Sequence, residues 1–295
     1  MKLRNFYFDF IGKRKIWFII SLVVILAGVA GFLIQGASFN LGIDFLGGSL
    51  MEVEFTRDVN ISEVRSVMSD MGLGNAILQQ TESKRFIIRT TPIDTETKNE
   101  MLDLLNEKIG ITGTPLQDRD VEPSFGKQIT KYAFIAVGIG IVGILIYVWI
   151  RFQFRFGVAA ILALVHDVLV TLGIYAILNR EINTATIAAI LTIIGYSIND
   201  TIVVFDRIRE NIPTAGKIGY TKVVNDSINT TLSRSINTSF TTLIPIILLL
   251  ILGTTALKDF ALALTVGIIA GTYSSIFIAS PILIAWNNRF PRYKK

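Results

Sequence analysis

Residues 16–34 are IWFIISLVVILAGVAGFLI, a run without a single charged side chain. A helix needs about 20 mostly apolar residues to cross the hydrocarbon core of a bilayer, so this stretch is long enough to span one. Three basic residues at 13–15 precede it, which is also the pattern of a signal peptide. The apolar core is long for a signal peptide, and residues 35–37 (QGA) make a poor cleavage site. We therefore expect a retained membrane helix.

The rest of the chain repeats this pattern. Hydrophobic residues make up 51% of the 295 residues and charged residues 17%, against about 25% charged residues in soluble domains. A soluble globule cannot hide that much apolar surface, so we predict a polytopic α-helical membrane protein. Its six transmembrane segments are predicted at residues 16–34, 132–150, 157–178, 184–205, 236–252 and 260–286, the last five forming a bundle over 131–286.

The distribution of Lys and Arg predicts the orientation, because short cytoplasmic loops are rich in both. With the N-terminus inside, the short outer loops hold only Arg180 and Lys258. We therefore expect residues 1–15 and 287–295 in the cytoplasm and residues 35–130 outside. The basic residues on the inner side would be Lys2, Arg4, Lys13, Arg14, Lys15, Arg151, Arg155, Arg207, Arg209, Lys217, Lys222, Arg234, Arg289, Arg292, Lys294 and Lys295.

The polar segment 35–130 shows the periodicities of a small α+β domain between the first and second transmembrane helices. Met51, Val53 and Phe55 alternate with glutamates, which predicts a half-buried strand. Apolar residues at helical spacing follow Asn60 and Asp94, which we predict as helix N-caps. The full set is strands at 51–55, 76–80, 86–90 and 115–121, with helices from 60 to 71 and from 94 to 109. This order, βαββαβ, is that of a ferredoxin-like domain.

No enzymatic site is evident in this domain. Its carboxylates are scattered, and we expect them to form a solvated surface; the alternative is a binding platform for an extended polypeptide at a sheet edge. The chain has no Cys and one His, which excludes disulfides and multi-His zinc sites. A G-x-G-x-x-G string at 138–143 lies inside a predicted transmembrane helix, where close helix packing explains it better than a dinucleotide. We expect no enzyme activity, no cofactor, no metal and no nucleic-acid partner.

Charged residues inside the apolar segments are functional candidates, because each costs at least about 2.5–3.5 kcal/mol at mid-bilayer. Asp200 is the first, and Tyr196, Ser197 and Asp200 are expected on one helical face, beside Asn199. Arg234 lies at the entrance of the fifth segment, whose helix we expect to begin before it, and is the expected partner of Asp200 on the neighbouring helix. A carboxylate that alternately pairs with Arg and takes a proton is a two-state element. The alternatives are a structural hydrogen bond for Asp200 and a snorkelling Arg234.

His166 and Asp167 form the third candidate, near the middle of the third segment. Adjacent residues on a helix point to different faces, so we expect the two side chains to separate. Asp167 would join a proton relay and His166 would titrate near neutrality. The alternative is polar packing within the bundle.

Four stretches resemble the SecF members of the bacterial SecD/SecF family of protein-export membrane subunits, in the resistance-nodulation-division superfamily. The resemblance extends over almost the whole chain. The stretches are GYSINDTIVVFDRIREN at 195–211, GIDFLGGSLMEV at 42–53, HDV at 166–168 and RSINTS at 234–239.

The resemblance implies a six-helix subunit of the bacterial cytoplasmic membrane that pairs with SecD to form a twelve-helix unit. That unit would assist the SecYEG channel and the SecA motor, often with YajC, and use the proton-motive force to draw unfolded preproteins outward. Asp200 would be the proton carrier and Arg234 its counter-charge, with a further acidic residue on SecD. The split rather than the fused form is expected. Sodium is an alternative coupling ion, since Ser197 and Asn199 offer oxygen ligands.

Two other functions stay open from the sequence. One is a proton-coupled exporter of small molecules or lipids that works as a homodimer, which would lack a SecD-like partner. The other is a scaffold of the translocase in which the charged residues only hold the bundle together, which would tolerate Asp200→Asn.

Overall fold

The computed structural model describes residues 7–291, apart from the side chains of residues 255 and 256. It divides into two units, a helical unit of residues 1–40 and 135–295 and an α+β unit of residues 41–134. Part of the predicted charge asymmetry lies outside the described residues, namely Lys2, Arg4, Arg292, Lys294 and Lys295.

The prediction of six apolar helices is confirmed. Among the described residues, six helices are long and apolar enough to cross a membrane. They are α1 (Arg14–Ile34), α5 (Pro123–Arg151), α6 (Phe154–Ile177), α7 (Thr184–Asn211), α9 (Tyr220–Leu252) and the continuous run of α10 (Thr255–Ser274), η2 (Ser275–Ala279) and α11 (Ser280–Arg289). Short helices η1 (Ile212–Thr214) and α8 (Ala215–Ile218) join α7 to α9.

Two helices begin well before the apolar runs that revealed them. The α5 helix starts at Pro123 instead of residue 132, and Pro suits the first turn because that turn needs no N–H donor there. The α9 helix starts at Tyr220, which is before Arg234 as expected but far ahead of the apolar run that begins at residue 236. Its polar first half forms a helix because one face is apolar and buried, through Tyr220, Val224 and Ile228.

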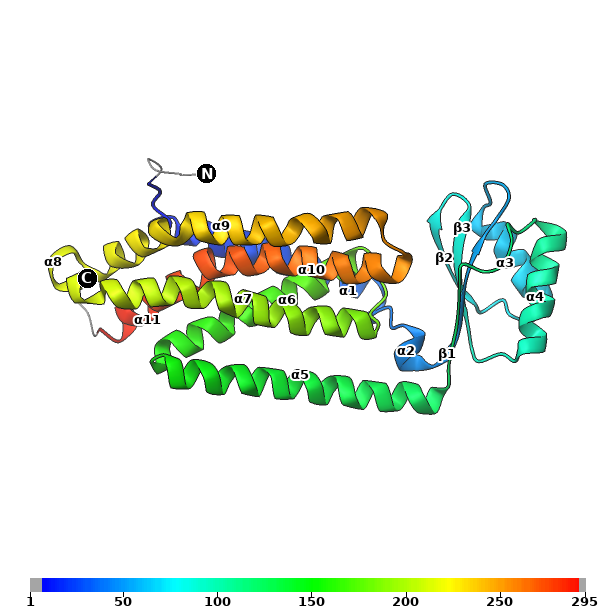
Figure 1. Ribbon diagram of the computed structural model, residues 1–295, viewed down its shortest axis with the longest axis horizontal. Helices are drawn as coiled ribbons and strands as arrows, with labels where there is room; N and C mark the ends of the chain where they lie inside the picture. The colour runs from blue at the N-terminus through cyan, green and yellow to red at the C-terminus, as the bar shows by residue number, and fades with distance from the viewer. Residues whose placement is uncertain (1–6, 292–295) are drawn as a thin grey trace. The chain divides into compact units, whose positions relative to one another are not determined.

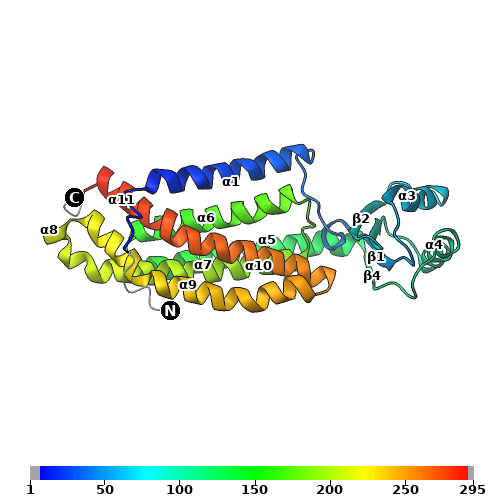
Figure 2. The ribbon, with the colours of Figure 1, turned by 90° about the horizontal axis from the view of Figure 1, so that it is seen from above.

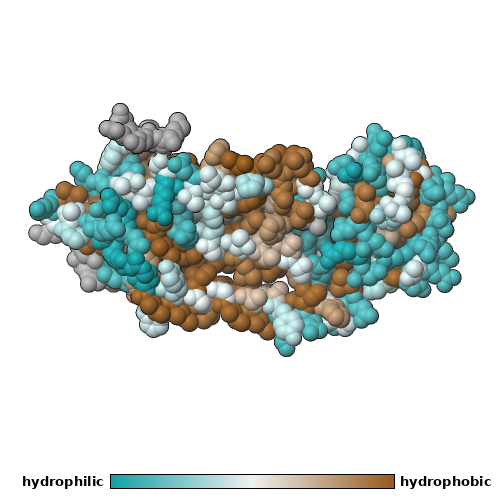
Figure 3. Space-filling model, viewed as in Figure 1, coloured by the Kyte–Doolittle hydropathy of each residue, from teal (hydrophilic) through white to brown (hydrophobic). Residues whose placement is uncertain are grey.

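The α10–α11 run is the innermost helix of the helical unit. Within the most apolar stretch of each helix, 61% of the α10–α11 residues are buried, against 6% of those of α5. The α10 helix contacts α6, α7 and α9 (Figures 1 and 2). The α1 helix packs on α6, where Gly28 faces Gly173 so closely that no side chain fits between them. The face of this unit in Figure 3 has broad apolar areas, as expected of a surface in contact with lipid or other apolar helices.

The segment before α1 is bound to the first half of α9 by two asparagine side chains. Asn225 Oδ1 accepts hydrogen bonds from the backbone N–H groups of Phe10 (2.8 Å) and Ile11 (3.3 Å). Asn229 Oδ1 accepts from the N–H of Phe8 at 2.9 Å, and both amide groups donate to the Phe8 carbonyl. Phe10 and Ile11 are buried, so these amides replace the partners that regular secondary structure would supply.

The α+β unit is a four-stranded antiparallel sheet with two helices, α3 (Ile61–Asp70) and α4 (Thr95–Lys108), packed on one face. The strands lie in the order β2 (Ile77–Glu82), β3 (Arg85–Thr90), β1 (Gly48–Glu54) and β4 (Gln117–Val121). Asn60 and Asp94 cap the two helices as predicted, Asn60 in a capping box with Glu63. Gly48 adopts φ +132°, and a Cβ there would lie 2.4 Å from the Thr90 carbonyl, so only glycine fits. Along the chain, the elements of the α+β unit are α2 (Ile43–Leu46), β1 (Gly48–Glu54), α3 (Ile61–Asp70), β2 (Ile77–Glu82), β3 (Arg85–Thr90), α4 (Thr95–Lys108) and β4 (Gln117–Val121).

The expectation that the carboxylates of this unit are solvated is wrong for two of them. Asp44 and Glu52 are buried, because the second face of the sheet also packs an apolar cluster that includes Ile43 and Leu50. Asp44 accepts a hydrogen bond from Arg119 at 2.7 Å, which compensates the burial of its charge.

Lys98 is also buried, and its ammonium group lies between two carboxylates of β4. The Nζ atom is 2.5 Å from Asp118 and 2.6 Å from Asp120. Burial opposes the charged form of Lys98, but the hydrogen bonds to the two carboxylates outweigh it and raise the pKa of Lys98. The same contacts lower the pKa of Asp120 against its own burial. The charges therefore attach α4 to the edge strand β4.

Candidate functional site

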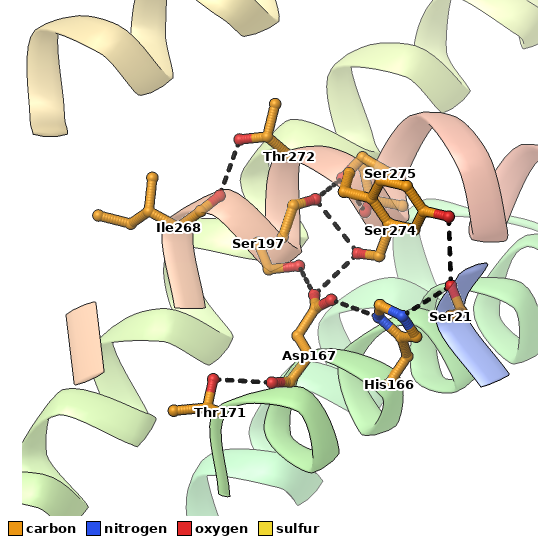
Figure 4. A network of polar contacts seen from close by, with 12 residues as sticks. Ser21, His166, Asp167, Thr171, Ser197, Ile268, Thr272, Ser274 and Ser275 are labelled. Atoms are coloured by element: carbon orange, nitrogen blue, oxygen red, sulfur yellow. Dashed lines mark hydrogen bonds and ion pairs between the residues drawn. The ribbon is translucent and has the colours of Figure 1, made fainter. Parts of the chain in front are cut away.

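A polar network lies inside the helical unit, centred on the fully buried Asp167 of α6 (Figure 4). The hydroxyls of Ser197 on α7 and Ser274 on α10 donate to Asp167 Oδ2 at 2.6 and 2.8 Å. His166 Nδ1 lies 2.9 Å from Asp167 Oδ1. Three polar groups from three helices thus converge on one carboxylate.

His166 extends this network to α1. Its Nε2 atom lies 3.1 Å from the hydroxyl of Ser21, and its ring is stacked on the Tyr273 ring. The expected separation of His166 from Asp167 is therefore only partly correct. The two residues face different helices, but their side chains still reach each other at 2.9 Å.

Asp200 has fewer close hydrogen bonds than Asp167, although the Ser275 hydroxyl and the charge of Arg234 also act on it at longer range. The hydroxyl of Ser235 on α9 donates to Asp200 Oδ1 at 2.6 Å. Asp200 is buried, at 8% exposure, yet within the described residues its Oδ2 atom has no hydrogen-bond partner. A buried oxygen of this kind is costly unless a proton, a cation or a water molecule satisfies it.

The predicted pairing of Asp200 with Arg234 is not formed in this conformation. Arg234 is exposed, and in the part of the chain described it makes no ion pair with Asp200. Successive residues of an α-helix are about 100° apart around its axis, and Ser235 is the residue of α9 that faces α7. Whether the pair forms in another state stays a prediction.

The polar stripe predicted on α7 is divided between partners. Ser197 donates to Asp167, whereas Tyr196 donates to Ser239 of α9 at 3.2 Å. Asn199 is exposed, and the structure does not bring it into the network. The three residues therefore do not act on Asp200 together.

Sequence reasoning missed the serines that surround the two carboxylates. The local pattern around Ser21, Ser235 and Ser274 does not identify their long-range partners. Ser275 follows Ser274 at the start of the π-helix η2, and its hydroxyl lies 2.8 Å from that of Thr201, the residue next to Asp200. A π-helical turn is rare and is frequent at functional sites. Here the π-helical turn begins between two adjacent serines: Ser274 contacts Asp167, whereas Ser275 contacts Thr201, next to Asp200.

No group of three His, Asp or Glu side chains that could hold a metal ion occurs among residues 7–291. The oxygens around Asp167 and Asp200 are hydroxyls and carboxylates, which can hold a proton or a hard cation. The chemistry that this arrangement supports is the binding and release of a small cation inside a helical bundle.

Comparison with known proteins agrees with this description. Residues 105–289 match the family model described as "Protein export membrane protein SecD/SecF, C-terminal", and residues 39–59 match the one described as "SecD/SecF GG Motif". The chain belongs to the SecD/SecF family of protein-export membrane proteins. It is 40% identical to protein translocase subunit SecF of Desulfurispirillum indicum, over 100% of this chain and 97% of that protein. SecF of Petrotoga mobilis is also 40% identical, over 97% of this chain and 98% of its own length.

The longer SecDF proteins of the family contain the same fold. Protein translocase subunit SecDF of Thermus thermophilus is 40% identical over 96% of this chain, which spans 39% of that protein. The crystal structure of SecDF from Thermus, a translocon-associated membrane protein, superposes with a TM-score of 0.89 over 98% of this chain and 40% of its own. SecDF in its super-membrane-facing form gives 0.71 over the same shares. The chain is thus a membrane protein similar to SecF and to part of SecDF.

Proposed function

We propose that this chain is the SecF half of a proton-driven complex that assists protein export. It pairs with SecD as a twelve-helix unit and works beside SecYEG, SecA and YajC in the bacterial cytoplasmic membrane. The relatives named translocase subunits support this, as do the SecDF proteins in which the matching region is part of one longer chain.

In this proposal both termini are cytoplasmic and residues 35–130 are external. The supporting observation is that the short outer loops contain few Lys and Arg residues. The α+β unit would be a ferredoxin-like domain, since its elements follow the order βαββαβ and its strands the order β2-β3-β1-β4. It would contact the unfolded preprotein outside the membrane.

The observation that carries the proposal is the half-satisfied carboxylate of Asp200. Its Oδ1 atom accepts from Ser235, and its buried Oδ2 atom is without a partner within the described residues. A proton on Oδ2 removes the charge of the Asp200 carboxylate, so the protonated form of Asp200 is compatible with this conformation. Loss of the proton leaves a buried anion that needs a cation, and Arg234 immediately precedes Ser235 on α9.

A rotation of α9 by up to about 100° exchanges Ser235 for Arg234 beside Asp200. The length of the Arg side chain reduces the rotation required. Moving one charge through 100 mV is worth about 2.3 kcal/mol. Since each 1.4 kcal/mol is a factor of ten, this biases the two states about fifty-fold. Proton flow through Asp200 would therefore drive a motion of α9.

The test is export of a secreted preprotein in cells whose only copy of the gene encodes Asp200→Asn. This change keeps the size and the hydrogen bond to Ser235 but removes the proton exchange. Loss of export with normal membrane levels of the variant and of SecD supports ion coupling through Asp200. Export at the wild-type level would sink it and favour the scaffold.

A matched control is Thr192→Val, also on α7. Thr192 is exposed and its hydroxyl donates only to the Ala188 carbonyl of its own helix, so export is expected to persist. Repeating the assay with sodium replaced by choline separates the two coupling ions. Co-purification of SecD with the chain excludes the homodimeric exporter.

A further inference from the structure

We infer that His166 is a second proton-binding site of this chain, with Asp167 as its fixed counter-charge and Ser21 of α1 as the group that responds to its charge. This inference rests on the proposed proton-driven function. It concerns a different helix pair from the Asp200–Arg234 switch.

The first step is the contrast between the two buried carboxylates. Asp167 accepts from Ser197 and Ser274 and contacts His166, so both of its oxygens have partners. Asp200 has one close donor, and its Oδ2 atom is without a hydrogen-bond partner in the described chain; Ser275 and Arg234 act on it only at longer range. Two carboxylates in such different surroundings take different roles, one as a permanent charge and one as a proton carrier. Asp167 is the permanent charge.

The second step is that this charge lies against the imidazole. Nδ1 of His166 lies 2.9 Å from Asp167 Oδ1, and an ionised carboxylate can only accept a hydrogen bond, so a charged Asp167 requires the proton on Nδ1. Nε2 can then gain or lose a proton toward Ser21. A protonated His166 forms a neutral pair with Asp167, so no net charge is added to the buried site. Histidine is the side chain whose ordinary titration falls near neutral pH.

The third step is the hydroxyl of Ser21, which has one proton and two possible acceptors. Tyr273 donates its own proton to the Trp17 carbonyl at 2.7 Å, so toward Ser21 its oxygen is an acceptor, at 3.4 Å. Neutral His166 also offers an acceptor, at Nε2. When His166 gains a proton, Nε2–H donates to Ser21 and the Ser21 proton turns to Tyr273. The proton on His166 thus reverses the hydrogen bond between α6 and α1.

The groups that face His166 from neighbouring helices are Ser21 of α1 and Tyr273 of α10, and Asp167 is beside it on α6. Asp167 and Tyr273 are the titratable groups among them. In the described chain, no Lys or Arg makes a hydrogen bond or ion pair with His166 or Asp167. The charge of His166 is therefore set by Asp167 and by the proton supply. The reversed bond acts on α1, the helix that leads along the chain to the α+β unit.

Because His166 is the only histidine of the chain, it can be observed directly. The full chain, with an affinity tag free of histidine, is labelled with ¹⁵N-histidine and studied in lipid nanodiscs by NMR from pH 5 to pH 9. We expect the ring to change from doubly to singly protonated within this range. Ser21→Ala should shift the midpoint, whereas Thr265→Val, which removes a hydroxyl bonded to its own helix, should not.

A ring that keeps one protonation state over the whole range overturns the inference. A titration that Ser21→Ala leaves unmoved overturns the role of Ser21. The outcome is independent of the proposed function, because the label reports protonation and not export. If Asp200→Asn abolishes export while His166 does not titrate, the proposed function stands and this inference falls.

Export supplies the second readout. His166→Gln keeps hydrogen-bonding groups but cannot become a cation. When the variant is present in the membrane at normal levels, we expect a simpler pH profile of export. The part of the profile that reflects the protonation of His166 should be absent. An unchanged pH profile would count against a functional proton on this residue.

Discussion

The contact between α1 and α6 leaves no space for a side chain at Gly28. A Cβ there would lie 2.6 Å from the Cα of Gly173, whereas ordinary contact begins at 3.4 Å. Gly28→Ala therefore forces the helices apart by about 0.8 Å. The obstacle is backbone, so no change of rotamer relieves it. Overpacking of this kind costs about 1–3 kcal/mol.

We expect Gly28→Ala to lower the thermal midpoint of the full chain in nanodiscs by at least about 2 °C. Tryptophan emission is a suitable probe, because Trp17 of α1 lies 4.4 Å from the Phe277 ring, measured between centroids. The control is Gly143→Ala on α5, where an added Cβ has nothing within 4 Å. It should leave the midpoint unchanged or raise it, since Ala favours helices over Gly. Equal midpoints for wild type and Gly28→Ala would refute the close packing described here.

Two further predictions concern other parts of the chain. The raised pKa of Lys98 means that its contribution to stability is complete below about pH 10.4 and is lost as the pH rises through the folded value. The lowered pKa of Asp120 makes its contribution complete above about pH 3.9 and lost as the pH falls through the folded value. Amide exchange along β4, corrected for intrinsic rates, should be slowest between these limits; protection that does not change outside them would contradict the ion pairs. Asn225→Ala removes the acceptor of two backbone N–H groups, which should destabilise the folded protein by about 1–3 kcal/mol. Proteolysis of the segment that precedes α1 should therefore become faster. Thr230→Ala, exposed on the same helix, is its control. Equal cleavage of both variants would argue against the attachment of residues 8–11 to α9 through Asn225 and Asn229.

The sequence was sufficient for the features that depend on local pattern. The six apolar helices and the caps Asn60 and Asp94 follow from hydrophobic periodicity and capping chemistry, both of which act within a few residues. The alternation predicted β1 as a strand, but the expectation that it is half-buried is wrong, because β1 is buried on both faces. The early start of α5 was not predicted, and that of α9 was predicted only as lying before Arg234, because a hydropathy window detects only the apolar part of a helix.

The candidate site was predicted in its residues but not in its pairings. Asp167, His166 and Asp200 were recognisable because a buried charge is costly in any bundle. Their partners Ser21, Ser235 and Ser274 are ordinary residues whose position depends on how distant helices pack. The burial of Asp44 and Glu52 was missed for the same reason, since it depends on the second face of the sheet.

The asparagine clamp on residues 8–11 has a consequence for the order of assembly during synthesis. Phe10 and its acceptor Asn225 are 215 residues apart in sequence. At about 5–20 residues per second, the ribosome completes Asn225 about 10–40 s after Phe10. Until then the backbone N–H groups of Phe10 and Ile11 must bond to water or to another protein. A segment that is synthesised well before its acceptor is therefore among the last to reach its final place in the bundle.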